Sequence, residues 1–164
     1  MRNNASIRQN CILIEAALSF IGAGIAGILW WQDRTAADLP CSSQGGCESV
    51  WNSAWSHIDI GAWHAVPVAL IGLVGYLFLF SLSMLRLASE SERMKNALHS
   101  AVWLVSTGGA GYSWYLQWIA HYKIGHFCIW CRSSAIIMTL IFFLAVFEFL
   151  AARSAADGEL VSHA

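Results

Sequence analysis

Charged residues are scarce in this sequence. Asp, Glu, Lys and Arg make up 12 % of its 164 residues, about half of the roughly 25 % found in an average soluble domain. The formal net charge is −1, so there is no surplus of basic side chains to neutralise phosphates, which argues against a nucleic-acid partner. Hydrophobic residues account for 57 %, more apolar surface than a soluble chain of this length could bury. We therefore expect a single integral membrane domain over residues 1–164.

Four stretches are apolar over the length that a helix needs to cross a bilayer, about 20 residues. They predict an all-α, four-transmembrane-helix bundle with helices at about 11–31, 60–85, 96–122 and 127–149. The tail after Arg153 is short and polar, so no fifth span is expected. No small-residue cleavage site follows the first apolar run, and we expect that run to remain as an uncleaved anchor.

Lysine and arginine are distributed unevenly about these spans. The two termini and the middle loop carry Arg2, Arg8, Arg86, Arg93, Lys95 and Arg153, whereas the other two loops and the start of the last helix carry Arg34, Lys123 and Arg132. Cytoplasmic loops hold the excess of basic residues in membrane proteins. This pattern predicts an inner or plasma membrane protein with both termini in the cytoplasm and with residues 32–59 on the periplasmic or extracellular side.

A CxxC motif stands at the start of the fourth predicted helix, formed by Cys128 and Cys131. At a helix N-terminus, unpaired backbone N–H groups and the helix dipole favour a thiolate on the first cysteine. His126 and Arg132 flank the motif and could add positive potential. The spacing lets the two sulfurs meet within one turn, so this pair can close and reopen.

Cys41 and Cys47 form a second, wider pair in the first external loop. Gly45 and Gly46 between them give the freedom that a thiol needs if it exchanges with two partners in turn. The predicted topology puts both pairs on the same, oxidising side, where disulfides form and persist. Cys11 stands alone at the other end of the first helix, and we expect it to pack as a small buried hydrophobe.

Other interpretations of the four cysteines stay open. They could form structural disulfides in a four-helix membrane scaffold or transporter, for which Glu15, Gln117 and Glu148 are the polar residues in the spans that hint at a pathway. A Cys₄ zinc site fits the CxxC but not the wider pair, and no metal is expected. Covalent haem attachment needs histidine directly after the CxxC, where this chain has Arg132.

Apolar residues recur at one-turn intervals after the loop pair. The residues are Val50, Trp51, Ala54, Trp55 and Ile58. They predict a short amphipathic helix that lies on the membrane surface, either as a lid over the bundle or as an ordinary interfacial anchor.

Taken in order, these motifs resemble the vitamin K epoxide reductase (VKOR) family, especially its bacterial members. The matching residues are Cys41 and Cys47, Ser53 six residues later, Val66 through Leu70, Gly72, Gly75, Tyr76, and Phe127 through Cys131. A wide pair followed by CxxC is the order found in this family, whereas DsbB-type proteins carry the CxxC first.

The resemblance implies a quinone-dependent thiol–disulfide oxidoreductase that generates disulfides in a thioredoxin-like partner. Cys41 would meet the thiol of the partner, and Cys47 would exchange with Cys128. Cys131 would face ubiquinone or menaquinone, and Ser53 would support the loop or the quinone site. Many bacterial members carry a fused thioredoxin domain, and this chain stops before one. We therefore expect a separate, soluble thioredoxin-fold (DsbA-like) partner.

A quinone needs an apolar slot with a few polar groups, which the bundle of Trp, Phe and Leu would supply. The expected quinone contacts are Cys131, His64, His126 and Trp130, and His64, His121 and His126 are candidates for proton transfer near neutrality. The small residues Gly108–Gly111 either let helices pack closely or leave space for a ligand. Ala135 stands where vertebrate members have tyrosine, so plain quinone reduction is expected rather than reduction of an epoxide.

Overall fold

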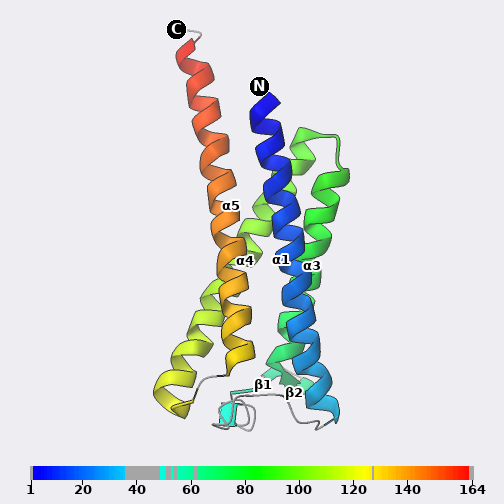
Figure 1. Cartoon of the computed structure of the whole chain (residues 1–164), viewed down its shortest axis with the longest axis vertical. Coiled ribbons are helices and arrows are strands. Elements are labelled where there is room, and N and C mark those ends of the chain that lie inside the picture. The colour runs from blue at the N-terminus through cyan, green and yellow to red at the C-terminus, as the bar shows by residue number, and fades with distance from the viewer. Residues whose placement is uncertain are drawn as a thin grey trace.

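The computed structural model describes residues 2–35, 49–50, 53, 55–60, 63–126 and 128–162, with side chains over 6–35, 49–50, 53, 55–58, 66–126 and 128–151. In chain order the elements are α1 (Arg2–Thr35), β1 (His57–Ile60), β2 (Trp63–Pro67), α3 (Val68–Ala88), α4 (Glu92–Ile119), the π-helical turn η1 (Ala120–Ile124) and α5 (Ile129–Ser162). The four long helices run side by side as a bundle (Figure 1). Both termini lie at one end, and the β1–β2 hairpin and the start of α5 lie at the other.

Three of the described helices are long and apolar enough to cross a membrane: Ser6–Thr35 of α1, Val68–Ala88 of α3 and Ile129–Ala151 of α5. Large apolar side chains such as Phe20, Phe143 and Phe147 are more than half exposed on the outside of the bundle, where a soluble protein would be polar. The chain is therefore a multi-pass membrane protein. α4 is 28 residues long, but its first turns are polar, and it is not one of the three candidate membrane spans.

The second predicted helix begins later than expected. Instead of a helix from residue 60, β1 pairs antiparallel with β2, with an irregular register between Ile58 and Ile60. Pro67 ends the hairpin and precedes the first residue of α3, because a proline disfavours helical backbone in the residue before it. The loop helix predicted through Ile58 is also wrong at its end, since Ile58 lies in β1. Ser49 and Val50 are helical, and residues 51, 52 and 54 lie outside the described ranges.

The other helices are longer than predicted, or end differently. α1 begins nine residues before Cys11, and α5 continues through the polar tail that was expected to follow it. α4 tightens into η1 and stops at Gly125, whose φ of 74° lies in the left-handed region that glycine adopts without strain.

Small residues allow the helices to approach closely at two places. A Cβ at Gly22 would collide with the ring of Tyr76, and a Cβ at Gly109 would lie 2.9 Å from the sulfur of Met138. Tyr76 and Met138 belong to the central apolar core, with Leu79 and Ile141. Within the segment Gly108–Gly111, Gly109 thus serves close packing of α4 against α5.

A charged cluster is buried in the half of the bundle that lies toward the termini. Arg86 is 1 % exposed. Its guanidinium donates to Glu15 of α1 at 2.7 Å and to Glu148 of α5. His99 of α4 lies 3.2 Å from the same Glu148 carboxylate. The cluster therefore ties all four helices together.

This arrangement corrects the sequence-based placement of Arg86 in the middle loop. Without it, five basic residues rather than six remain on the predicted cytoplasmic side against three on the other, so the bias keeps its direction. Glu15 and Glu148, which hinted at a transport pathway, are paired with Arg86 instead.

Candidate functional site

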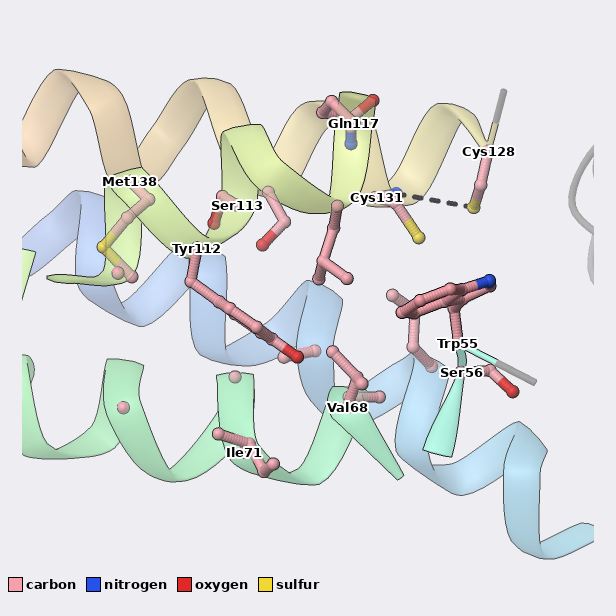
Figure 2. Close-up of a pocket in the computed structure, with 18 of the residues that line it drawn as sticks. Trp55, Ser56, Val68, Ile71, Tyr112, Ser113, Gln117, Cys128, Cys131 and Met138 are labelled. Carbon is pink, nitrogen blue, oxygen red and sulfur yellow. Dashed lines mark hydrogen bonds between the residues drawn. The ribbon is translucent and has the colours of Figure 1, made fainter. Parts of the chain in front are cut away.

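The CxxC motif lies at the hairpin end of the bundle, where α5 begins. Cys128 directly precedes α5 and is buried, and Cys131 lies in its first turn. The backbone N–H of Cys131 points at the sulfur of Cys128, with 3.4 Å between nitrogen and sulfur (Figure 2). Both are free thiols. The first turn of the helix therefore holds the two cysteines together, as the spacing predicted.

Hydrogen bonds within this turn stabilise a thiolate on Cys128. The Cys131 thiol and the backbone N–H groups of Cys131 and Trp130 lower the pKa of Cys128 to about 6, although burial acts in the opposite direction. A cysteine with this pKa is mostly deprotonated at neutral pH, which is the reactive form. The sequence predicted this thiolate from the helix N-terminus. The hydrogen-bond donors that stabilise this thiolate belong to the motif itself. His126, which was expected to add positive potential, is exposed.

A largely apolar cavity of about 530 Å³ lies beside the CxxC between the four helices. Its volume is typical of small-molecule sites. Cys128 and Cys131 form part of its wall, and Trp55 and Ser56 lie at the same end (Figure 2). The remaining wall consists of Ala26, Leu29, Asp33, Val50, Ser53, Pro67, Val68, Ala69, Ile71, Gly72, Gly75, Tyr76, Leu104, Val105, Gly108, Gly109, Tyr112, Ser113, Leu116, Gln117, Ile119, Ala120, Ile124, Ser134 and Met138.

A few polar groups interrupt the apolar wall. Tyr112, Ser113 and Gln117 come from α4, and Figure 2 shows Tyr112 extending into the space between the helices. The Tyr76 hydroxyl is held by Ser134, one turn after the CxxC, at 2.7 Å from its carbonyl oxygen and 3.0 Å from its hydroxyl. An apolar slot with few polar groups fits a quinone ring and its isoprenoid tail.

Ser53, for which the resemblance implies support of the loop or the quinone site, lines the cavity. Its hydroxyl donates to the carbonyl oxygen of Val50 at 2.6 Å, and its own carbonyl accepts from the Ser56 hydroxyl at 2.9 Å. Ser53 thus fixes the turn that leads into β1.

Two of the other quinone-contact residues predicted with Cys131, Trp130 and His126, lie outside the cavity wall. Trp130 is half-buried, and His126 is exposed. His121 is exposed and its ring packs against Tyr122. His64 belongs to β2, with its side chain outside the described set. Cys41 and Cys47 also lie outside the described residues, so their roles stay predictions.

Sequence reasoning missed a polar chain at the cavity wall. His57 Nδ1 lies 2.8 Å from the Ser56 hydroxyl, and His57 Nε2 lies 3.3 Å from a carboxylate oxygen of Asp33. The adjacent Ser56 and His57 could have been noticed in the sequence. Asp33, the partner of His57, lies 24 positions before it at the end of a different element, and no local pattern connects the two.

The match to known proteins covers most of the chain. A model described as "Vitamin K epoxide reductase family" matches residues 13–146, which include all four cysteines of the two predicted pairs.

Proposed function

The chain belongs to the vitamin K epoxide reductase family and is a membrane thiol oxidoreductase; on that premise we propose that it transfers electrons from an external dithiol through its two cysteine pairs to a quinone. The observation that carries this proposal is the position of Cys128 and Cys131 in the wall of an apolar cavity of about 530 Å³. A structural disulfide would need no such cavity beside it. The proposed acceptor is ubiquinone or menaquinone.

The proposed cycle begins with the loop pair. Cys41 receives the thiolate of the partner, the Cys41–Cys47 disulfide opens, and the dithiol of the partner becomes a disulfide. Cys47 then attacks Cys128 in the Cys128–Cys131 disulfide and releases Cys131 as a thiolate. Attack of Cys41 on Cys47 restores the loop disulfide and releases Cys128.

The low pKa of Cys128, about 6, supports the last of these steps, because a thiol of low pKa is a good leaving group. Cys128 and Cys131 then close to a disulfide, giving two electrons to the quinone, which also takes up two protons. The net reaction converts one dithiol and one quinone into one disulfide and one quinol. In this cycle the quinone supplies the oxidising power, and the chain holds the thiolates and excludes water around them.

We further propose that α4 is the fourth span and that both termini are cytoplasmic. α3 ends near the termini and α5 starts at the hairpin end, so α4 connects the two ends of the bundle (Figure 1). The basic residues favour the cytoplasm for the end with the termini. The CxxC would then face the periplasm or the extracellular space, where a soluble thioredoxin-fold (DsbA-like) partner can dock.

The proposal is tested with purified protein, a reduced thioredoxin-fold protein and a quinone. Without quinone, wild type should oxidise the partner for one turnover only. Further turnovers should require quinone. Cys131→Ala should abolish quinone reduction, and Cys41→Ala should abolish partner oxidation. Cys11→Ala is the matched control, since Cys11 is buried outside the cavity wall. Equal rates of partner oxidation and quinone reduction in all four proteins would contradict the proposal.

A further inference from the structure

We propose that His57 and Asp33, with Ser56 positioning the His57 ring, form a proton relay that carries protons from the external water to the cavity. This inference rests on the proposed quinone reduction and names the groups that supply one of its two protons. The three side chains come from two separate segments, the last turn of α1 and the start of β1. They form one continuous chain through the two nitrogens of the His57 ring.

The relay connects the cavity with water. Asp33 and Ser56 belong to the cavity wall, and the Asp33 side chain is only 14 % exposed. His57 lies behind them, and its side chain is 36 % exposed. A proton can therefore enter at His57 from solvent and leave at the cavity wall through Asp33.

The hydrogen bonds define where the proton is held. The Ser56 hydroxyl donates its one hydrogen to the carbonyl oxygen of Ser53, so it accepts from Nδ1–H of His57. An ionised Asp33 carboxylate can only accept, and it faces Nε2. A protonated imidazole donates to both neighbours, whereas a neutral ring satisfies one of them. With Nδ1–H bonded to Ser56, Nε2 faces Asp33, so a proton that His57 takes up from water can pass to this carboxylate.

The cavity needs such a source. The Cys128–Cys131 pair supplies the two electrons of quinol formation. The Cys131 thiol brings one proton, but Cys128 is a thiolate, so the second proton has to come from another titratable group in contact with the cavity. Among the described residues of the wall, Asp33 is the charged side chain. A single carboxylate in a largely apolar wall, next to a histidine, is a typical arrangement for proton transfer.

The proton transfers balance for each quinol. The His57 imidazolium gives its Nε2 proton to Asp33, which gives it to the oxygen that is being reduced, and His57 takes another proton from water. One such transfer, together with the proton of the Cys131 thiol, completes one quinol. Among the residues that the structure describes, the groups that face His57 are Asp33 from α1 and Ser56 from its own segment. Pro67, opposite to it on β2, does not titrate.

The test separates the two half-reactions. His57→Gln and Asp33→Asn keep the size and polarity of each side chain but remove the transferable proton. Both should oxidise one equivalent of reduced partner at the wild-type rate without quinone. Quinone reduction by the pre-reduced variants should fall on the order of 100-fold near neutral pH, the usual contribution of general acid catalysis. Glu90→Gln, an exposed carboxylate in the α3–α4 connection, is the matched control and should behave as wild type.

A pH profile distinguishes a proton relay from a structural role. The residual rate of both variants should rise as pH falls, because protons must then come directly from water, and added imidazole should accelerate His57→Gln but not Asp33→Asn. If wild type reduces quinone and both variants do so at the same rate, the relay is overturned and the proposed function stays intact. Loss of both half-reactions in the variants would also overturn it, since Asp33 and His57 would then only support the fold. Absence of quinone reduction in wild type would remove the proposed function itself.

Discussion

At the scale of single residues, the chemistry of the site depends on the first turn of α5. The donors around Cys128 are the thiol of Cys131 and the backbone N–H groups of the same turn. They make one cysteine of the motif a thiolate near neutral pH while its partner provides the hydrogen bond. The motif thus arrives at the cavity wall in a state that is ready for thiol exchange.

The reactivity of Cys128 with a small alkylating reagent should therefore follow a low pKa. In reduced protein with Cys41 and Cys47 replaced by alanine, alkylation should increase with pH with a midpoint near 6, since the thiolate is the form that reacts. Cys131→Ala removes the thiol donor and should move the midpoint upward, toward the ordinary value of 9.0. Mass spectrometry of the labelled peptide measures both. A midpoint near 9.0 in each protein would contradict the account.

Sequence reasoning reached part of this site. The CxxC, its place at a helix start and the favoured thiolate all follow from residues that are adjacent in the chain. The contribution of Asp33 could not be predicted, because its partner His57 is brought to it by the hairpin that follows the loop. Sequence position alone favours histidines nearer to the CxxC, such as His126, and His126 is exposed.

At the scale of elements, the spans were predictable and their ends were not. Long apolar runs determine α1, α3 and α5 because the bilayer requires them. The apolar stretch around residues 60–67 is compatible with a helix or a strand by pattern alone. In the structure Ile60 ends β1 and Trp63–Pro67 is β2, so α3 begins only after Pro67. The hairpin brings His57 against α1 and so contributes to the cavity.

The buried cluster at Arg86 holds the helices together at the other end. Arg86→Met should destabilise the protein by about 3–5 kcal/mol, because Glu15 and Glu148 would be left as buried carboxylates without their cation. Arg93→Met, on the exposed first turn of α4, is the control and should have little effect. Thermal unfolding in detergent measures the difference.

Replacing the whole charged group gives a second check on this interpretation. A triple variant, Glu15→Leu, Arg86→Met and Glu148→Leu, should recover much of the stability lost by Arg86→Met, since no unpaired charge remains. If Arg86→Met unfolds at the same temperature as wild type, the cluster does not join the helices in the way that the contacts suggest.

At the scale of the whole molecule, the two ends of the bundle carry different functional groups. The end with the termini contains the charged cluster and most of the basic residues, and the hairpin end contains the CxxC and the cavity (Figure 1). If the hairpin end faces the oxidising compartment, an external partner reaches the cysteines while the quinone reaches the cavity from the membrane.

This orientation predicts which side of the membrane is accessible to a thiol reagent. In a cysteine-free background, Lys123→Cys on η1 should react with an impermeant maleimide added to intact cells. Ser89→Cys, between α3 and α4, should react only after the membrane is opened. The reverse pattern would show that both termini are external, and labelling of both positions from outside would remove α4 as a span.

The central claim is that the CxxC delivers electrons to a quinone, and single-turnover quinone reduction by pre-reduced protein tests it most directly. In a Cys41→Ala and Cys47→Ala background, the remaining Cys128–Cys131 dithiol should reduce about one equivalent of quinone, because each dithiol carries two electrons. Adding Cys131→Ala to that background should abolish the reaction. Quinone that stays oxidised in the presence of the intact dithiol would contradict the account.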